Sequence, residues 1–365
     1  MAEINGHTFE SSKPVNVAIL GDGQMGLVCA VVLCASAELP DRASDAPMPG
    51  RITMWGHDTD EIGRLAQSRT SPRLPELVLP ESVHVSLTDA GALADADLIV
   101  SALPVQYTRD VWNRLRRHIP SHASVVSVSK GIETSTLLRP THIIADALKD
   151  DPDARPRPIG VLSGPTIATE LARCLPATMT AASDDAAFAR VIQSLFSTTF
   201  LRIYTNADVL GVELAGATKN VIAIAAGILD GLQAGYNAKS ALLARGIAEI
   251  SRLGSAMGAS VQTFNGIAGV GDLATTCFSP EGRNRSCGEA LGRGERLDEY
   301  LKRTKSVVEG VQTARAVVAL AEKFRVEMPI TSAVHAVLFE DLDPIRAISQ
   351  LMSRELRSEG PSHAM

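Results

Sequence analysis

One short segment constrains the fold of this chain more than any other. The β-branched run Val15–Leu20 is followed at once by Gly21-Asp-Gly-Gln-Met-Gly26 and then by an apolar stretch over residues 27–35. A buried strand, a tight glycine turn and a helix in immediate succession bring a helix N-terminus up to a pyrophosphate. Gly21 permits the turn, Gly23 lets the backbone approach the ligand, and Gly26 allows close packing of the helix. The segment therefore predicts a dinucleotide-binding unit.

Further strand candidates alternate with helical segments up to about residue 204. They lie at residues 51–55, 97–104, 124–129, 159–163 and 177–182, the last completing the expected sheet. This alternation is typical of an α/β protein with a doubly wound, parallel (Rossmann) sheet. We therefore expect a Rossmann domain over residues 14–204, preceded by a flexible segment over residues 1–13. Residues 38–50 are rich in Pro, Asp, Ser and Ala and are interpreted as a surface insertion.

The second half of the chain has a different pattern. Long segments with helical periodicity lie at residues 209–232, 238–257, 283–291, 310–324 and 333–339. They predict an all-α domain over residues 205–345, followed by a polar C-terminal tail over residues 346–365 whose end we expect to be disordered.

A single charge, Lys219, interrupts the apolar stretch of residues 214–229. A helix of this composition should be buried. A lysine within it must be paired, or partly neutralised by desolvation, and is then a candidate for proton transfer. The alternative is a lysine that reaches the surface or pairs with Glu213. This segment alone leaves both interpretations open.

Two other stretches of the second half carry polar groups that suit an anionic ligand. A glycine-rich turn presents Asp272, and Arg283-Asn284-Arg285 begins a predicted helix. Guanidinium charge, an amide donor and helix N–H groups can converge on a phosphate. The alternative for the basic triplet is a solvated turn.

Polar residues also follow two strands of the first domain, at the edge where ligands bind in doubly wound sheets. Lys130 follows one strand, and its alternative is a solvated loop lysine. His57 and Asp58 follow the second strand. An acidic residue there favours the ribose hydroxyls of NAD, whereas arginine favours the phosphate of NADP. The alternative for Asp58 is the N-cap of the next helix, so the cofactor preference stays open.

The composition excludes several classes of function. The chain is 45% apolar and 21% charged, as in ordinary soluble proteins, and its net charge of −6 argues against nucleic-acid binding. Its five cysteines and eight histidines show no ligand spacing, which predicts no metal site and reduced cysteines, as in a cytoplasm. The N-terminus lacks an apolar signal core, and we expect no membrane span.

Taken together, these segments resemble the NAD(P)-dependent glycerol-3-phosphate dehydrogenase family over roughly residues 15–340. The shared motifs are, in order, Gly21-Asp-Gly-Gln-Met-Gly26, Lys130-Gly-Ile-Glu133, Gly164-Pro-Thr-Ile-Ala-Thr-Glu170, Glu213-Leu-Ala-Gly-Ala-Thr-Lys-Asn220, Gly269-Val-Gly-Asp-Leu273 with Thr276-Cys277, Arg283-Asn-Arg285 and Val307-Val-Glu309-Gly310. All seven in one order form a specific signature. The resemblance implies reversible reduction of dihydroxyacetone phosphate by NAD(P)H to sn-glycerol 3-phosphate for glycerophospholipid synthesis, in a homodimer.

The resemblance also implies roles for individual residues. Lys219 is expected to be the general acid/base, and Asp272 its partner. The substrate-binding residues implied are Lys130, Gly164, Thr166, Lys219, Asp272, Arg283 and Asn284. The cofactor-binding residues implied are Gly21, Gly23, Gln24, Met25, Gly26, His57, Asp58, Lys130, Ala168, Arg283, Val307 and Glu309.

The chain departs from the family pattern at several positions. Gln24-Met25 stand where small or hydroxyl residues and an aromatic are common, and Ile167 stands where phenylalanine is common. Gly282 replaces the usual serine before the basic triplet, which removes one hydroxyl. His57-Asp58 stand where the family often has an arginine, which puts a preference for NADP in doubt.

Two other functions are compatible with parts of the sequence. One is a related two-domain dehydrogenase of the 3-hydroxyacid or 6-phosphogluconate type, which also uses a lysine on a helix. The other is a catalytically weak NAD(H)-binding redox sensor, which would keep the glycines and could lose Lys219 or Asp272. The presence of both residues, together with the basic triplet, favours an enzyme with a small phosphorylated substrate.

Overall fold

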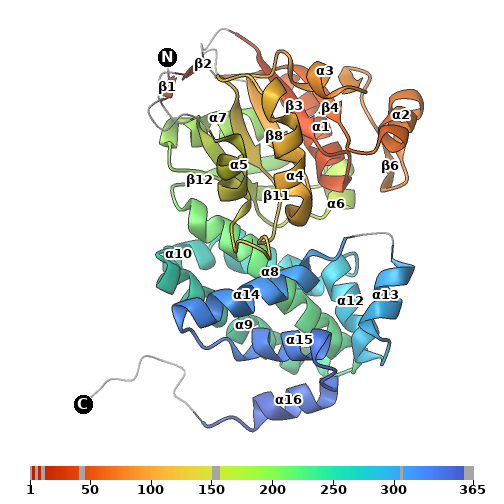
Figure 1. Cartoon of the computed structure of the whole chain (residues 1–365), viewed down its shortest axis with the longest axis vertical. Helices are drawn as coiled ribbons and strands as arrows, with labels where there is room; N and C mark the ends of the chain where they lie inside the picture. Colours follow the sequence, from red (N-terminus) through yellow and green to blue (C-terminus); the bar gives the residue numbers. More distant parts are fainter. Residues whose placement is uncertain are drawn as a thin grey trace.

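The computed structural model describes residues 2–4, 7–9, 13–40, 46–149, 157–304 and 307–356. A domain built on a large sheet lies at one end of the molecule and a helical domain at the other (Figure 1). The last strand, β12, ends at Asn206, and helix α8 begins at Val209. The predicted succession of a Rossmann-like domain and an all-helical domain is confirmed.

The large sheet has the strand order β12-β11-β10-β9-β8-β3-β4-β7. Its strands are β3 (Val15–Leu20), β4 (Pro49–Trp55), β7 (Val83–Ser86), β8 (Leu98–Ser101), β9 (Ser124–Ser127), β10 (Ile159–Ser163), β11 (Ala177–Ser183) and β12 (Leu201–Asn206). All neighbours from β7 to β10 pair in parallel. Strand β11 pairs antiparallel to β10, and β12 pairs parallel to β11. The predicted parallel sheet is thus mostly parallel, with one antiparallel pair between β10 and β11, and β7 and β12 are additions to the predicted strands.

Helices cover both faces of this sheet. They are α1 (Gln24–Ala37), α2 (Thr59–Ser68), α3 (Asp89–Leu93), α4 (Val105–Leu115), α5 (Pro140–Leu148), α6 (Ala168–Ala172) and α7 (Ala186–Phe196), with a 3₁₀ turn η1 (Arg116–His118). Alternate residues of β3 enter two different cores. Val17 and Ile19 pack with α1 and α7, whereas Ala18 and Leu20 pack with α4 and α5. A sheet buried on both faces explains why its strands are continuous apolar runs.

Two short strand pairs lie outside this sheet. Strands β1 (Ala2–Ile4) and β2 (His7–Phe9) pair with each other within the segment predicted to be flexible. Strands β5 (Thr70–Ser71) and β6 (Leu74–Val78) form a hairpin after α2. Residues 41–45 of the predicted insertion and residues 357–365 of the predicted tail lie outside the described residues.

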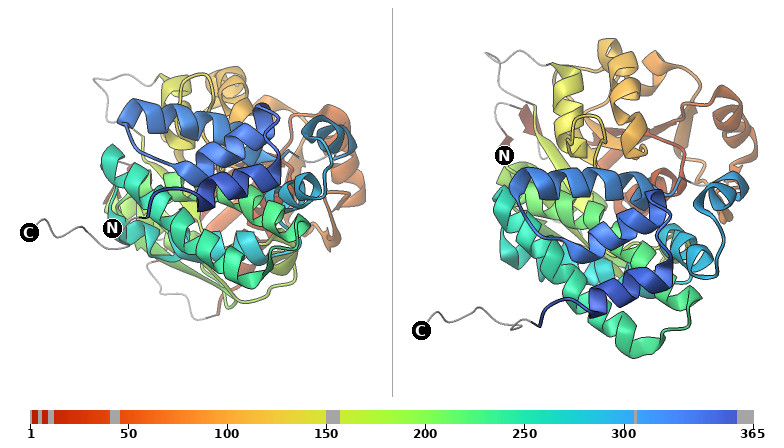
Figure 2. Two further views of the ribbon diagram at one scale, coloured as in Figure 1. Left: turned by 90° about the horizontal axis from the view of Figure 1, so that it is seen from below. Right: turned by 60° about the horizontal axis from the view of Figure 1, so that its bottom comes forward.

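The second domain consists of helices packed around α8. They are α8 (Val209–Gly231), α9 (Gly235–Met257), α10 (Val261–Phe264), a π-helical turn η2 (Ile267–Gly271), α11 (Asp272–Phe278), α12 (Arg283–Gly292), α13 (Leu297–Arg303), α14 (Glu309–Phe324), α15 (Pro329–Phe339) and α16 (Pro344–Met352). Figure 2 shows these helices, green to blue, as one layered bundle. Helix α16 extends into the segment predicted to be a tail.

Helix α8 forms the centre of this domain. Among the described helices it alone is long and apolar enough to cross a membrane, but 89% of its apolar window is buried inside the protein. It contacts α9, α11, α12 and α14, and it also reaches β10 of the sheet. The prediction of a buried helix is confirmed, and α8 is a core helix that links the two domains.

Glycines let α8 and α12 approach each other at the level of the backbone. A Cβ atom on Gly227 of α8 would lie 1.9 Å from the carbonyl oxygen of Arg285, and one on Gly288 of α12 would lie 1.9 Å from that of Ile224. Gly231 and Gly292 make similar approaches one turn further along. This glycine seam fixes α12 relative to α8 through direct backbone contacts.

Candidate active site

The glycine loop has the geometry that a dinucleotide requires. Gly21 adopts φ +116°, and a Cβ atom there would lie 2.7 Å from the carbonyl oxygen of Ala102. A Cβ on Gly26 would lie 1.9 Å from the Gly21 oxygen, so the helix can pack this closely only with glycine. Gly23 has open space where its Cβ would be, and no side chain caps α1. The free N–H groups of α1 therefore suit a pyrophosphate.

Gln24 and Met25, which replace the small and aromatic residues common in the family, have different surroundings. The amide of Gln24 donates from Nε2 to the carbonyl oxygen of Arg73, at 2.9 Å, and so ties the loop to the β5–β6 hairpin. Met25 is half-buried and packs against the core on the α1 side. Both lie in the first turn of α1, beside the expected cofactor.

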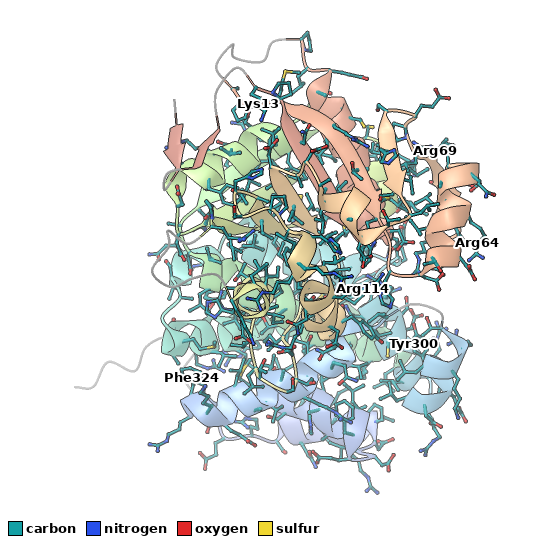
Figure 3. All side chains as sticks on the ribbon, turned by 45° about the horizontal axis from the view of Figure 1, so that its top comes forward. Lys13, Arg64, Arg69, Arg114, Tyr300 and Phe324 are labelled. Atoms are coloured by element: carbon teal, nitrogen blue, oxygen red, sulfur yellow. The ribbon has the colours of Figure 1, made fainter. Side chains whose placement is uncertain are left out.

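Asp58 is the N-cap of α2, as the alternative interpretation proposed. Its Oδ1 accepts from the backbone N–H groups of Asp60 and Glu61, both at 2.9 Å, and these bonds lower the pKa of the exposed carboxyl group. His57 Nδ1 lies 3.4 Å from Nη1 of Arg114. Figure 3 labels Arg114 on α4, and its guanidinium is already bonded twice to Asp89, at 2.8 Å each.

Lys219 belongs to a buried cluster in which two lysines share one carboxylate. Asp272, the first residue of α11, is fully buried, and its Oδ1 accepts from Lys219 Nζ. Its Oδ2 accepts from Lys130 Nζ at 2.7 Å. Lys219 also donates to Thr276 Oγ1 at 2.6 Å. The cluster brings together one residue after β9, one from α8 and two from α11.

Burial sets the chemical state of Lys219. Desolvation lowers the pKa of its ammonium group to about 8, with the nearby charge of Lys130 acting in the same direction and the carboxylate of Asp272 acting against both. A lysine with such a pKa can exchange a proton near neutral pH. The alternative pairing with Glu213 is wrong, because Glu213 is bonded to Arg139 and to Thr141. Lys130 is likewise no solvated loop lysine, since its side chain is 18% exposed.

Gly164 and Thr166 lie at the end of β10, beside this cluster. The Gly164 carbonyl oxygen accepts from Lys130 Nζ at 2.9 Å and from Thr166 Oγ1 at 3.2 Å. Gly164 adopts φ +153°, and a Cβ atom there would lie 2.9 Å from Cα of Met179. Ala168 begins α6 just beyond and packs against the sheet core. Lys130 is thus held from both domains at once.

Arg283 and Asn284 start α12 on the other side of α8. Asn284 Nδ2 donates to Asn220 Oδ1, and its own Oδ1 accepts from the Gly310 N–H, both at 2.9 Å. Arg283 forms no hydrogen bond or ion pair with any described residue, although surrounding protein lowers the pKa of its guanidinium by desolvation. An arginine that is accessible to solvent, has no protein partner and is partly desolvated by its surroundings suits an anionic ligand. Arg285, in contrast, is bonded to Asp230 and to the Ser279 carbonyl oxygen and serves structure.

Glu309 connects the helical domain to the sheet domain. It is the first residue of α14, and its Oε1 accepts from the N–H of Val105, at 3.3 Å, where α4 begins. Burial raises the pKa of its carboxyl group to about 7, while that N–H and the charge of Arg283 act in the opposite direction. Val307 precedes it and is 40% exposed. Glu309 therefore joins the N-terminal ends of α4 and α14, and Val307 lies just before α14.

The structure adds two residues that sequence reasoning did not assign. Thr276 lies one turn after Asp272 and contacts Lys219, and the spacing of four residues on one helix could have indicated this. Asn220 follows Lys219 and holds the side chain of Asn284. A cavity of about 670 Å³ lies near α6, β12 and Thr275. None of its lining residues belongs to the predicted site.

Comparison with known proteins gives one consistent result. A family model described as the NAD-dependent glycerol-3-phosphate dehydrogenase N-terminus matches residues 16–189, and the model of its C-terminus matches residues 208–349. Glycerol-3-phosphate dehydrogenase (NAD(P)+) 1 of Salinibacter ruber is 44% identical over 94% of this chain and 97% of its own length. The Listeria monocytogenes glycerol-3-phosphate dehydrogenase (NAD(P)+) is 42% identical over 95% and 98%. The crystal structure of glycerol-3-phosphate dehydrogenase from Coxiella burnetii matches with a TM-score of 0.85 at 33% identity, covering 93% of this chain and 99% of that one.

Proposed function

This chain belongs to the NAD-dependent glycerol-3-phosphate dehydrogenase family, and we propose that Lys219 is the acid of its reaction. The reaction is the reversible, NAD(P)H-dependent reduction of dihydroxyacetone phosphate to sn-glycerol 3-phosphate. When bound, the reduced nicotinamide supplies the hydride. One observation carries the proposal for Lys219: its ammonium is buried against the Asp272 carboxylate, which it shares with Lys130, and its pKa is lowered to about 8.

The proton is transferred at Lys219 Nζ. In the reduction, the substrate carbonyl oxygen gains a proton while its carbon gains the hydride, and Lys219 in its ammonium form donates that proton. Asp272 holds Nζ in one orientation. Lys130, on the other oxygen of the same carboxylate, disfavours a second positive charge and so promotes proton release. In the oxidation, the neutral amine of Lys219 accepts the hydroxyl proton. A general acid/base of this kind contributes about 10²–10⁴-fold in rate.

We propose that the substrate phosphate binds at the start of α12. Arg283 offers a guanidinium with no partner among the described residues, and Gly282 leaves the helix N-terminus without a side-chain cap. Asn284 is held in place by Asn220 and by the Gly310 N–H. Guanidinium charge, an amide and free helix N–H groups form a common phosphate site. Lys130, Gly164 and Thr166 would line the substrate from the sheet domain.

The residues of the sheet domain fit a dinucleotide, and we propose how they share it. Gly21, Gly23 and Gly26, with Gln24 and Met25, would hold the pyrophosphate at the N-terminus of α1. His57 and Asp58 would lie at the adenosine ribose. The residues proposed for the nicotinamide end, at the junction of the domains, are Lys130, Ala168, Arg283, Val307 and Glu309.

Three further proposals concern the setting of the reaction. We propose that the product supplies the backbone of glycerophospholipids, because sn-glycerol 3-phosphate is that backbone with its phosphate. We propose a cytoplasmic enzyme, which the five free cysteines support. As the family resemblance implies, we propose a homodimer, which light scattering on the purified protein would test.

The test of the reaction is NADH and NADPH oxidation, followed at the nicotinamide absorbance band with and without dihydroxyacetone phosphate. We expect oxidation that depends on this substrate. The variant Lys219→Met should bind NADH normally but lose about 10²–10⁴-fold in turnover. Lys239→Met is the matched control, because Lys239 is an equally buried lysine that pairs with Asp230 and not with Asp272.

The outcomes separate the proposals. Near-native turnover of Lys219→Met would refute the role of Lys219. Cofactor binding without turnover by the unaltered enzyme would move the assignment to a hydroxyacid substrate or to a redox sensor. An equal loss of turnover in Lys239→Met would show that the loss follows from removing a buried lysine of this domain and not from removing a proton donor.

A further inference from the structure

The basic start of α12 has an acidic neighbour in the chain. Glu281 stands two residues before Arg283, and only Gly282 separates them. Gly282 has extended backbone angles, φ −71° and ψ 113°, and an extended residue places the side chains before and after it on one side of the chain. A carboxylate and a guanidinium at such positions can form an ion pair when nothing else holds them. Arg283 nevertheless has no ion-pair partner among the described residues.

The carboxylate of Glu281 is held by the other domain. Thr169, the second residue of α6, donates a hydrogen bond from its hydroxyl group to Oε2 of Glu281. Figure 1 shows α6 at the edge of the sheet domain that faces the helical domain. Since Thr169 and Glu281 are 112 residues apart and belong to different domains, this bond exists only while the two domains are in contact. It directs the carboxylate toward α6, and Arg283 stays unpaired.

A second acidic residue near Arg283 is held in the same way. Desolvation lowers the pKa of the Arg283 guanidinium, whereas the charge of Glu309 acts to raise it, so the two groups lie within electrostatic range. Oε1 of Glu309 accepts from the N–H of Val105, where α4 of the sheet domain begins. Arg73 also acts on Arg283, as a like charge, and is itself paired with Glu61. Both acidic neighbours that the helical domain places near Arg283 are thus bonded by donors of the sheet domain.

We propose that Thr169 keeps Arg283 free for the substrate phosphate by holding the competing carboxylate of Glu281 on the sheet domain. Thr169 and Glu281 are positioning residues, which act through Arg283. The inference rests on the proposed phosphate site at the start of α12 and concerns how that site is kept open. A carboxylate of the protein competes with a phosphate because both are oxyanions that accept hydrogen bonds from the same guanidinium.

The arrangement makes phosphate binding depend on contact between the domains. When α6 and α12 are apart, Glu281 is free to pair with Arg283, and the site is blocked from within. When the two helices meet, the hydroxyl group of Thr169 takes the carboxylate, and the guanidinium is available to a ligand. The competition changes the affinity for the phosphate and leaves the proton transfer at Lys219 as it is. Its loss should therefore appear in KM and not in kcat.

The first experiment measures the reduction of dihydroxyacetone phosphate at saturating NADH. Thr169→Val removes the hydroxyl group and keeps the shape of the side chain, so the freed carboxylate should raise KM about three- to fivefold, as expected of a partly exposed ion pair. The value of kcat should change less than about twofold. Thr199→Val is the matched control, because Thr199 is an exposed threonine of the same domain whose hydroxyl group is bonded by no described residue.

Rescue separates competition from a loss of structure. Glu281→Gln removes the charge that competes for Arg283, so combining it with Thr169→Val should return KM to within about 1.5-fold of the unaltered enzyme. If the hydrogen bond merely held the loop before α12 in place, the double variant would keep the raised KM. Glu322→Gln is the control for charge, because Glu322 is an exposed carboxylate near the far end of α14. Combined with Thr169→Val, it should restore nothing.

Binding of inorganic phosphate tests the same contact without the reaction. Calorimetric titration of the full-length, NADH-saturated protein keeps the pyrophosphate site filled, so that added phosphate reports on α12. Phosphate affinity should fall about three- to fivefold in Thr169→Val and return in the double variant with Glu281→Gln. Arg283→Met should lose most of the affinity, because it removes the guanidinium itself. Thermal melts establish that each variant is folded.

The outcomes distinguish the inference from the proposed function. An unchanged KM and phosphate affinity in Thr169→Val would overturn the inference, and so would a double variant that is not rescued. Absent turnover of dihydroxyacetone phosphate, with phosphate affinities in the expected order, would refute the reaction and leave the inference standing. Full phosphate affinity in Arg283→Met would refute the phosphate site and the inference together.

Discussion

The two domains use aspartate in opposite ways. In the helical domain, Asp272 is fully buried and is bonded by two lysines. In the sheet domain, Asp22 and Asp58 are partly or fully open to solvent, and no described lysine or arginine is bonded to them. A charge interacts far more strongly in a desolvated site than in a solvated one. A carboxylate can therefore hold a proton donor in one domain and stay available to a ligand in the other.

The largest difference between the two regions should appear when each aspartate is changed to asparagine. Asp272→Asn leaves two buried ammonium groups without their carboxylate, which should lower the free energy of unfolding by about 3–5 kcal/mol. It should also lower turnover by about 10²-fold or more, because Lys219 loses its orienting partner. Asp58→Asn keeps the helix cap and should change the free energy of unfolding by less than about 0.5 kcal/mol. Denaturant unfolding and steady-state rates measure both effects.

Equal losses in the free energy of unfolding for Asp272→Asn and Asp58→Asn would contradict this comparison. A readout that general structural damage would not produce is the pH profile. Loss of the Asp272 charge removes the interaction that raises the pKa of Lys219, so the profile of any residual activity should move to lower pH. An unmoved profile would show that Asp272 acts on stability alone.

Two glycine-to-alanine changes test the backbone of the same two regions. Gly288→Ala places a Cβ atom 1.9 Å from the Ile224 carbonyl oxygen in the glycine seam and should destabilise the protein by about 1–3 kcal/mol. Gly63→Ala lies within α2, where nothing is found within 4 Å of the added Cβ, and should stabilise it by about 0.5–1 kcal/mol. Denaturant unfolding of both variants gives the two signs. Changes of the same sign would argue against a seam of backbone contacts.

The last prediction is a pH dependence confined to the buried cluster. The ammonium of Lys219 is the reactive form in the reduction, so turnover should fall about tenfold per pH unit above its pKa of about 8. The neutral amine is the reactive form in the oxidation, so that rate should rise with pH and level off above the same pKa. Asp58 titrates far below this range because its pKa is lowered, so NADH affinity should change little. Initial rates in both directions test the opposite slopes.

Local sequence patterns were sufficient to predict much of the site. The glycine loop, the buried Lys219 and the basic start of α12 each depend on residues within one short segment, and the structure places them as expected. The resemblance then correctly placed Asp272 beside Lys219, although 53 residues separate them. The local structure of a short segment that requires a special backbone geometry can be predicted without knowledge of the rest of the fold.

Features that depend on long-range packing were not predictable in this way. Lys130 and Asp272 are 142 residues apart, and no pattern in either segment indicates that two lysines share one carboxylate. The direction of β11 is also absent from its sequence, because a buried apolar strand reads the same in a parallel or an antiparallel pair. The glycines before Asp272 suggested a turn, whereas they form the π-helical turn that leads into α11.

The glycine seam has a consequence for substrate length. Backbone contacts between α8 and α12 fix the helix that carries Lys219 against the helix that carries the proposed phosphate residues Arg283 and Asn284. A phosphate anchored at α12 then brings only one carbon of a chain opposite Lys219. A ketone phosphate with one extra carbon between carbonyl and phosphate would bind with its carbonyl out of register. Selection between shorter and longer ketone phosphates would thus depend on the fixed distance between two helices.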